Sequence, residues 1–166
     1  TDHHELEGNA IPDAFAVIDP KRPDCTYAFK QLAGVGVAFR LAQSLLRGAR
    51  TRGMQRNGIS EADLLDYVAI GTVADMVKLD ANNRRLVRAG LSRIRKGQCQ
   101  PGVKALARIS GVELEALSET DIGFRLTPKI NAAGRLEDMS LGIECLLSES
   151  LPAAMEMATS LASINA

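Results

Sequence analysis

Apolar residues recur at a spacing of three and four along most of this chain, and this periodicity limits its fold more than any other feature. Between residues 32 and 50 the residues at this spacing are Val35, Phe39, Ala42, Leu45 and Leu46. Similar patterns predict further helices over residues 60–70, 82–96, 101–108, 118–124, 139–147 and 152–164. Only residues 14–18, closed by Asp19 and Pro20, are typical of a strand. The sequence therefore predicts a helix-rich fold.

Local signals indicate where several of these helices begin and end. Ser60 and Ser118 are each followed three residues later by an aspartate, the arrangement of a capping box. Gly97 is expected to end the helix before it. Residues 71–76 are expected to form a turn of small residues, and residues 127–135 are too polar and glycine-bearing for a plain core helix.

Two glycines stand in the first turn of the helix predicted over residues 32–50. Gly34 and Gly36 lack a β-carbon, so another group can approach the backbone closely there. An anion is one such group, but tight packing is the expected reason for a single Gly-x-Gly.

Composition excludes several classes of protein. Of the 166 residues, 46% are apolar, which suffices for a buried core. No apolar run approaches the length of a membrane span, and the N-terminus has no signal-peptide pattern. Cys25, Cys99 and Cys145 form no C-x-x-C pair, so the sequence predicts reduced, mostly buried thiols in a cytoplasmic protein.

Both ends of the sequence are abrupt. The chain opens on Thr1 without an initiating Met, and its last predicted helix runs to Asn165 and Ala166 without a cap. We therefore expect an excerpt of a longer chain, about one domain in size.

Charge is sorted along a chain whose formal net charge is zero. Residues 81–112 carry basic side chains and no acidic one, and no basic residue follows Arg135. The basic residues of this run are Arg84, Arg85, Arg88, Arg93, Arg95, Lys96, Lys104 and Arg108. A local basic surface can bind phosphates even when the whole is neutral. Charge alone favours the alternative, a solvated helix face.

The triplet Asp2-His3-His4 contains the chain's two histidines. Imidazole and carboxylate groups are ligands that Mn²⁺ and other divalent metals accept. A histidine pair near a terminus is also typical of an expression-tag remnant, although tags usually carry a longer run. Both interpretations stay open on the triplet alone.

Two further segments place polar groups among small residues. Asp75 follows Gly71-Thr72-Val73-Ala74, where a buried carboxylate needs a partner or a metal. Alone, an N-cap or an ion-pair partner is the better interpretation of Asp75. In Asn131-Ala132-Ala133-Gly134-Arg135 the small residues allow close approach and Arg135 offers a fork of donors to phosphate. A tight turn with a surface arginine explains that segment equally well.

The order of these motifs resembles the RecJ-type exonucleases of the DHH phosphoesterase superfamily over essentially the whole chain. The motifs are Thr-Asp-His-His-Glu at 1–5, Leu-Ala-Gly-Val-Gly-Val-Ala-Phe at 32–39, Gly-Thr-Val-Ala-Asp at 71–75 and Asn-Ala-Ala-Gly-Arg at 131–135. The Asp-His-His triplet indicates only the superfamily. The segments at 34–39 and 131–135 indicate the RecJ-like branch.

The resemblance implies an α/β fold. The chain would be the helix-rich C-terminal half of a DHH phosphoesterase domain, residues 1–166, whose parallel sheet comes largely from an N-terminal part that precedes Thr1. Its final helix would lead to a downstream domain. The family's aspartate-rich motifs on earlier strands have no match here, which leaves the metal site incomplete.

The resemblance also implies a site for two Mn²⁺ or Mg²⁺ ions. His3 and Asp75 would be metal ligands, Asp2 would support the histidines or the metal shell, and His4 would lie beside the scissile phosphate as a charge stabiliser or acid. Arg135, with Asn131, would contact DNA phosphate. A weaker extension places Arg84 and Arg88 along the path of the strand.

The implied function is metal-dependent 5′-to-3′ hydrolysis of single-stranded DNA to mononucleotides in recombination and repair. A single-strand-binding protein and a helicase are the expected partners of the parent enzyme, with no membrane. One alternative is a phosphatase of the same superfamily acting on pyrophosphate or short oligonucleotides. The other is a non-catalytic helical piece that binds nucleic acid weakly, and inactivity is expected of the isolated chain.

Overall fold

The computed structural model describes residues 1–6, 11–54, 58–132, 134 and 139–165. Throughout these described residues the regular structure is helical, and no strand is present. None of the described helices is long and apolar enough to cross a membrane. The chain divides into two compact units, Thr1–Arg88 and Ala89–Ala166, and the division falls inside one helix, α3 (Ala81–Arg95).

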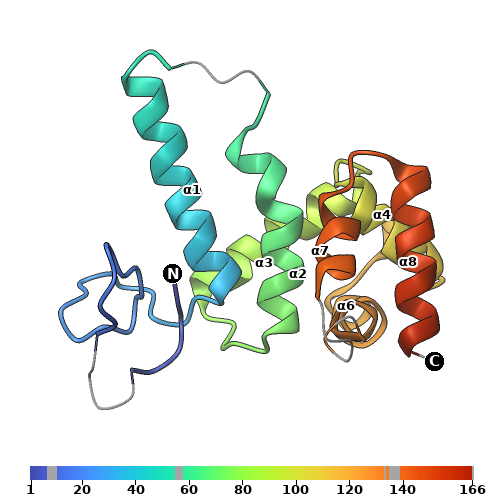
Figure 1. Cartoon of the computed structure of the whole chain (residues 1–166), viewed down its shortest axis with the longest axis horizontal. Helices are drawn as coiled ribbons and strands as arrows, with labels where there is room; N and C mark the ends of the chain where they lie inside the picture. The colour runs from blue at the N-terminus through green and yellow to red at the C-terminus, as the bar shows by residue number, and fades with distance from the viewer. Residues whose placement is uncertain (7–10, 55–57, 133, 135–138, 166) are drawn as a thin grey trace. The chain divides into compact units, whose positions relative to one another are not determined.

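The first unit contains an irregular N-terminal segment and the antiparallel helices α1 (Gly34–Thr51) and α2 (Leu65–Ala74). A short 3-10 helix, η2 (Glu61–Leu64), leads into α2, and the first half of α3 completes the unit. Figure 1 shows α1 and α2 side by side, in cyan and green. The core between them is formed by Leu32, Val37, Phe39, Val68 and Leu86.

The contact between α1 and α2 depends on the absence of a side chain at Gly71. A β-carbon there would lie 2.7 Å from Cγ1 of Val35. Helix α2 continues to Ala74, so residues 71–74 are helical where we expected a turn over residues 71–76. That expectation was wrong because small residues, which favour turns in isolation, here permit close helix packing.

The far end of α1 is less covered than its periodicity predicts. Phe39 is buried, but Leu45 is 64% exposed. The buried residues of α1, Gly36, Val37 and Phe39, all lie near its N-terminal end, so only this part of the helix contributes to the described core.

Residues 14–18 do not form the predicted strand. Phe15 is fully exposed, and the backbone contacts of this stretch are few: the Ile18 carbonyl accepts from the Asp2 N–H at 3.0 Å, and the Val17 carbonyl accepts from Arg22 at 2.7 Å. A strand needs a neighbouring strand for its ladder of hydrogen bonds. No such neighbour exists among the described residues, so the sequence preference is not realised.

The second unit contains the remainder of α3, α4 (Pro101–Ile109), α7 (Ser140–Leu147) and α8 (Leu151–Asn165). Between α4 and α7 the chain forms η3 (Leu114–Ala116), α5 (Glu119–Asp121), a π-helical turn labelled η4 (Ile122–Leu126), and α6 (Thr127–Ala132). The last three follow one another without a break, so residues 119–132 form one helical segment.

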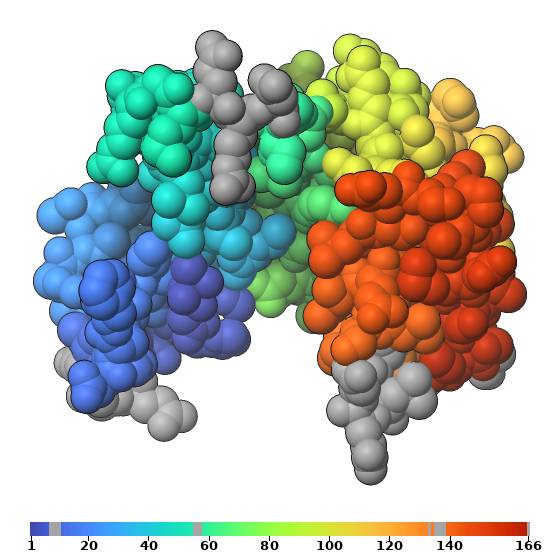
Figure 2. Space-filling model, turned by 45° about the horizontal axis from the view of Figure 1, so that its top comes forward, coloured from blue at the N-terminus to red at the C-terminus, as the bar shows by residue number. Residues whose placement is uncertain are grey.

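Helix α8 packs against α4, α6 and α7 in the core of the second unit. Figures 1 and 2 show α7 and α8 side by side, in orange and red. The fully buried side chains include Leu106, Ile122, Leu126, Cys145 and Leu161. Burial raises the pKa of the Cys145 thiol, which therefore stays protonated and unreactive.

Most of the helix boundaries predicted from the sequence are confirmed. Ser118 caps its helix: its hydroxyl accepts from the Asp121 N–H at 3.2 Å, and its own N–H donates to the Asp121 carboxylate at 3.0 Å. Ser60 donates to Asp63 in the same arrangement. Gly97 ends α3 with a φ of 68°. The segment at 127–135 differs in part, because residues 127–132 are helical.

Candidate metal and phosphate site

His3 and Asp75 meet in the first unit although they lie far apart in the sequence. Nε2 of His3 lies 2.8 Å from Oδ2 of Asp75. The His3 side chain is 17% exposed and the Asp75 side chain 36% exposed, so the pair stands at the surface with one side open. The structure thus brings together the two residues predicted as metal ligands.

The start of α1 forms the wall behind His3. A β-carbon on Gly34 would lie 3.2 Å from Nδ1 of His3, so glycine lets the imidazole approach the first turn of the helix closely. The Asp2 N–H donates to the Ile18 carbonyl and fixes the backbone just before His3. The predicted tight packing at Gly34 is confirmed, and its partner is the histidine ring.

Asp75 stands where α2 ends. Its N–H still donates to the Gly71 carbonyl at 3.0 Å, and the next residue, Met76, has a φ of 52°. This left-handed conformation is unfavourable for a residue with a β-carbon, and the Met76 side chain is 89% exposed. The strained conformation turns the chain away immediately after the carboxylate, so α2 stops with Asp75 at its end.

Asn83 is a positioning residue that we did not single out from the sequence. Its side-chain amide donates to the Gln31 carbonyl at 2.6 Å and to the Lys78 carbonyl at 2.9 Å, and it is 1% exposed. One asparagine thus ties the loop after Asp75 to the segment before α1. An asparagine in a helix gives no sequence signal of such a role, because its partners lie far away in the chain.

Asp2 and His4 form a second contact beside the first. Oδ1 of Asp2 lies 2.7 Å from Nδ1 of His4 and also accepts from the His3 N–H at 2.7 Å. The hydrogen bond from His4, followed by that from the His3 backbone, lowers the pKa of Asp2 to about 2. Asp2 therefore supports the histidine pair as an ionised carboxylate, and His4 is largely exposed.

The donor set fits a divalent cation of the Mn²⁺ type. Candidate ligand atoms of Asp2, His3 and His4 all lie within 4.8 Å of one another. Adjacent ligands of an octahedral ion with bonds near 2.1 Å stand about 3 Å apart, which matches the 2.8 Å between His3 and Asp75. Imidazole with carboxylate suits Mn²⁺. These residues can also make a hydrogen bond without an ion.

The predicted basic residues of the first unit lie on the exposed face of α3. Arg84 and Arg88 are one helical turn apart and exposed. Nε of Arg84 donates to the Leu79 carbonyl at 2.8 Å, so this arginine is held against the loop that follows Asp75. Arg85 is exposed beside them. The buried stripe of Leu86, Val87, Leu91 and Ile94 faces the opposite way, as predicted.

The remaining predicted phosphate-binding residues belong to the second unit. Asn131 lies in α6 and is exposed. Arg135 lies outside the described residues. The structure therefore brings His3, Asp75, Asp2 and His4 together, and it describes Asn131 only within its own unit.

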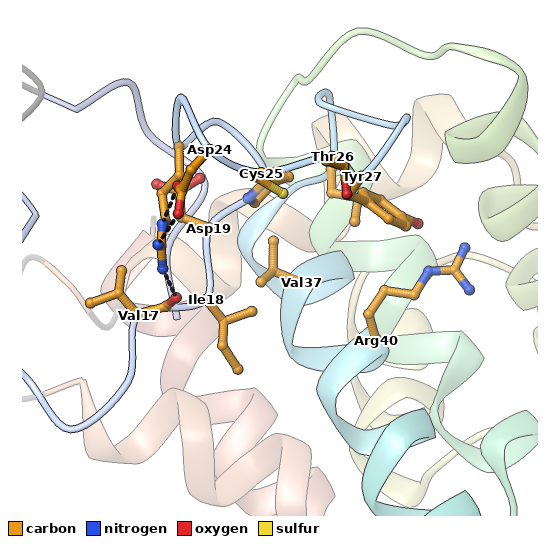
Figure 3. Close-up of a pocket in the computed structure, with 12 residues that line it drawn as sticks. Val17, Ile18, Asp19, Asp24, Cys25, Thr26, Tyr27, Val37 and Arg40 are labelled. Carbon is orange, nitrogen blue, oxygen red and sulfur yellow. Dashed lines mark hydrogen bonds and ion pairs between the residues drawn. The ribbon is translucent and has the colours of Figure 1, made fainter.

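The first unit also has a cavity of about 520 Å³ near the N-terminal segment. Figure 3 shows Asp24 and Val17 at one side of it and Arg40 at the other, with Val37 and Ile18 between. Arg22 also lines the cavity and donates to the Asp24 carboxylate and to the Val17 carbonyl. The Arg22 guanidinium lowers the pKa of Asp24. None of the site residues above lines this cavity, and its walls are mostly apolar.

The sequence of the chain is similar to those of known proteins. Residues 1–72 match the model of the "DHH family, N-terminal domain". The chain is 51% identical to the single-stranded-DNA-specific exonuclease RecJ of Salmonella typhimurium, over 99% of this chain and 29% of that protein. It is 42% identical to the protein of the same name from Bacillus subtilis, over 99% of this chain and 19% of that protein.

Solved structures of exonuclease RecJ have a similar fold. One bound to manganese superimposes with a TM-score of 0.70 at 30% identity and covers 86% of this chain and 34% of that chain. RecJ from Thermus thermophilus in complex with Mg²⁺ gives a TM-score of 0.68 at 30% identity, over 86% of this chain and 21% of that one. The chain thus spans less than a third of the length of the Salmonella relative.

Proposed function

We infer that this chain belongs to the RecJ-like branch of the DHH family, because its motifs, its helical fold and its identity to RecJ exonucleases agree over nearly its whole length. We propose that it acts within a metal-dependent exonuclease that degrades single-stranded DNA from the 5′ end to mononucleotides, in recombination and repair. The observation that carries the proposal is the 2.8 Å contact between His3 and Asp75.

The proposed roles follow the positions of the side chains. His3 and Asp75 hold a divalent ion, with Asp2 orienting the histidines through its contacts to both. His4, exposed and beside Asp2, stands ready to stabilise charge or deliver a proton to the leaving oxygen. A bound divalent ion lowers the pKa of water and neutralises the developing charge on phosphate.

Basic and amide side chains are proposed to hold the DNA backbone. Arg84, fixed against the loop after Asp75, and Arg88 one turn further along α3 offer guanidinium forks to phosphates near the metal. Asn131 and Arg135 are proposed to make further phosphate contacts. Arginine suits this task because its planar donors match phosphate oxygens.

The chain by itself is proposed to be inactive. Two firm ligands, His3 and Asp75, are fewer than a divalent ion in a two-metal site requires. The α/β character of the fold is also a proposal. Residues 14–18 would join a parallel sheet whose other strands are supplied from outside this chain. The full exposure of Phe15 supports this proposal.

A phosphatase acting on pyrophosphate or short oligonucleotides is the alternative within the superfamily. The exposed arginines on α3 favour a longer anionic substrate instead. A cytoplasmic location and partnership with a single-strand-binding protein and a helicase stay predictions.

Titration of Mn²⁺ into the chain, followed by calorimetry, tests the proposed metal site. We expect weak binding that His3→Ala and Asp75→Asn abolish. Asp13→Asn changes an exposed carboxylate outside the proposed donor set; it is the matched control and should bind as the unaltered chain does. Equal binding by all variants would reject His3 and Asp75 as ligands.

Nuclease assays on 5′-labelled single-stranded DNA test the activity. The full-length protein that contains this chain should release labelled mononucleotide with Mn²⁺, and the isolated chain should not. Turnover by the isolated chain would refute its inactivity. Hydrolysis of pyrophosphate as fast as DNA would favour the phosphatase.

A further inference from the structure

Phe124 is an exposed aromatic side chain in the second unit that no step of the proposed chemistry uses. It is 80% exposed, whereas its helical neighbours Ile122 and Leu126 are fully buried. A single exposed apolar side chain is ordinary on a protein surface. Phe124 therefore indicates a ligand only through the groups that surround it.

The helix around Phe124 is widened into a π-helical turn over Ile122–Leu126. The cause lies four residues further on: Pro128 has no N–H to donate to the Phe124 carbonyl, and its ring would clash with that carbonyl in an α-helix. The Thr127 N–H instead donates to the Ile122 carbonyl, five residues back. Such turns are frequent at functional sites.

Phe124 heads a stripe of side chains on one face of this helical segment. Pro128 and Asn131 follow it at spacings of four and seven residues, which places them on the same side of a helix. Asn131 is exposed, and Pro128 is partly exposed. An aromatic ring, a proline ring and an amide thus succeed one another along a single surface.

Positive charge flanks this stripe. Arg125 is exposed, and its Nε lies 3.4 Å from Oδ1 of Asp121, which itself holds Ser118. Nζ of Lys129 donates to the Arg125 carbonyl, a neutral group, and no acidic partner is found for it among the described residues. The same carbonyl accepts from the Ser110 hydroxyl at 3.2 Å, so the end of α4, with exposed Arg108, adjoins this turn. The acidic residues of the segment, Glu119 and Asp121, stand in its first turn, before Phe124.

We propose that Phe124 is a stacking platform for a base of single-stranded DNA. Arg125 and Lys129 bind the phosphates adjacent to that base, and the Asn131 amide contacts the strand next to them. Base stacking on an exposed aromatic ring beside cationic side chains is the usual way to hold a single strand without reading its sequence. The inference rests on the proposed function for the nature of the ligand. It adds a binding residue in the second unit.

Charge decides in favour of a nucleic acid over an apolar protein partner. A protein that buried Phe124 would also have to cover Lys129, five residues further along the same helical segment, whose ammonium group has no acidic partner among the described residues. Single-stranded DNA supplies a flat apolar base and a phosphate in alternation, which matches an aromatic ring next to cations.

The absence of tryptophan from the chain permits a direct test. Phe124→Trp introduces a single indole at the proposed platform, where stacking with a base quenches its emission. The variant is titrated with oligothymidylate in EDTA, and separately with an abasic deoxyribose-phosphate strand of equal length. We expect oligothymidylate to quench the indole and the abasic strand to leave its emission nearly unchanged.

Phe15→Trp is the matched control, because Phe15 is also exposed but the guanidinium described at its stretch, that of Arg22, is already paired with Asp24. Its emission should respond to neither strand. Phe124→Leu keeps an apolar side chain of similar bulk without a π-face, and should weaken oligothymidylate binding by about fivefold to a hundredfold. Circular dichroism should show an unchanged fold, since the altered side chain is exposed.

Equal quenching of the Phe124→Trp variant by both strands, or wild-type affinity in Phe124→Leu, would overturn the platform. So would concentration-dependent self-association that Phe124→Leu abolishes, because a second copy would then be the cover. Because the titrations exclude metal, they separate this inference from the proposed function. A full-length protein without Mn²⁺-dependent nuclease activity refutes the function and leaves quenching intact.

Discussion

Cγ1 of Val35 lies 2.7 Å from the position that a β-carbon on Gly71 would take. Val35 stands one residue after Gly34, which contacts His3, and Gly71 stands one helical turn before Asp75. The packing of these two residues therefore sets the distance between the two walls of the candidate metal site.

Gly71→Ala should force α1 and α2 apart. The added methyl meets the branched carbons of Val35, and overpacking of this kind destabilises by about 1–3 kcal/mol. Thermal unfolding followed by circular dichroism should show a lower Tm, and calorimetry should show weaker Mn²⁺ binding.

Gly48→Ala is the matched control for that substitution. Gly48 lies in α1, and no described atom outside its own helical backbone stands within 4 Å of the position of its β-carbon. Alanine is the better helix former, so this variant should gain about 0.5–1 kcal/mol. Destabilisation of both variants alike would contradict the packing argument.

Asn83→Ala should loosen the loop that follows Asp75. The substitution leaves the carbonyls of Gln31 and Lys78 without their donor, at a cost of about 1–3 kcal/mol. Mn²⁺ affinity should fall by about tenfold, the typical effect of losing a residue that orients a metal ligand. Asn82→Ala is the control, because the Asn82 side chain accepts from Arg40 and no hydrogen bond from its amide nitrogen to that loop is described. Equal metal affinity in the two variants would exclude Asn83 as a positioning residue.

Met76→Gly should stabilise the first unit. A left-handed residue after a helix is usually glycine, and removal of the β-carbon at a φ of 52° relieves about 1 kcal/mol. The exposed Met76 side chain gives up little packing in exchange. Chemical denaturation should show a higher midpoint with an unchanged slope; a lower midpoint would mean that Met76 makes contacts that offset the strain.

Gly102→Ala should unfold the second unit far more readily. Its β-carbon would lie 2.1 Å from the Cys145 carbonyl oxygen and 2.8 Å from Cα of Leu146, and backbone cannot give way as a side chain can. We expect a loss of about 3 kcal/mol or more. Alkylation of the buried Cys145 thiol, whose Sγ lies 3.6 Å from the Ala154 carbonyl, should accelerate in this variant. Unchanged protection of Cys145 would refute the clash.

The Ser118–Asp121 cap should make the second unit sensitive to acid. Hydrogen bonds from the Ser118 hydroxyl and N–H lower the pKa of Asp121 in the folded protein. The stabilisation is therefore complete above the ordinary carboxyl pKa of about 4 and is lost as the pH falls through the lower, folded value. Asp121→Asn should lower Tm near neutral pH, and its difference from the unaltered chain should vanish in strong acid.

Glu119→Gln is the control for the acid prediction. Glu119 stands in the same first turn and shares any interaction with the helix dipole, but no bond to the cap is described for it. Its Tm difference should stay small at every pH. A pH profile equal to that of Asp121→Asn would assign the effect to the dipole instead of the cap.

The sequence predicted the helices well because their signals are local. The capping serines, the glycine after α3 and the buried stripe of Leu86, Leu91 and Ile94 all follow from residues within a few positions. The strand at 14–18 and the turn at 71–76 were wrong because their outcome depends on distant partners. A strand needs a neighbouring strand, and the requirement for glycine at position 71 comes from its close contact with Val35.

The sequence by itself determined the helical content, the identity of His3 and Asp75 as candidate ligands, and the likeness to RecJ exonucleases. Only the tertiary structure decided that the two candidate ligands meet at 2.8 Å, that Asn83 holds the loop beside them, and that Phe124 faces water on a π-helical turn. The physical reason is that periodicity and caps act within one or two helical turns. Contacts between residues as distant in the chain as His3 and Asp75 depend instead on how α1, α2 and α3 pack, which no local pattern encodes.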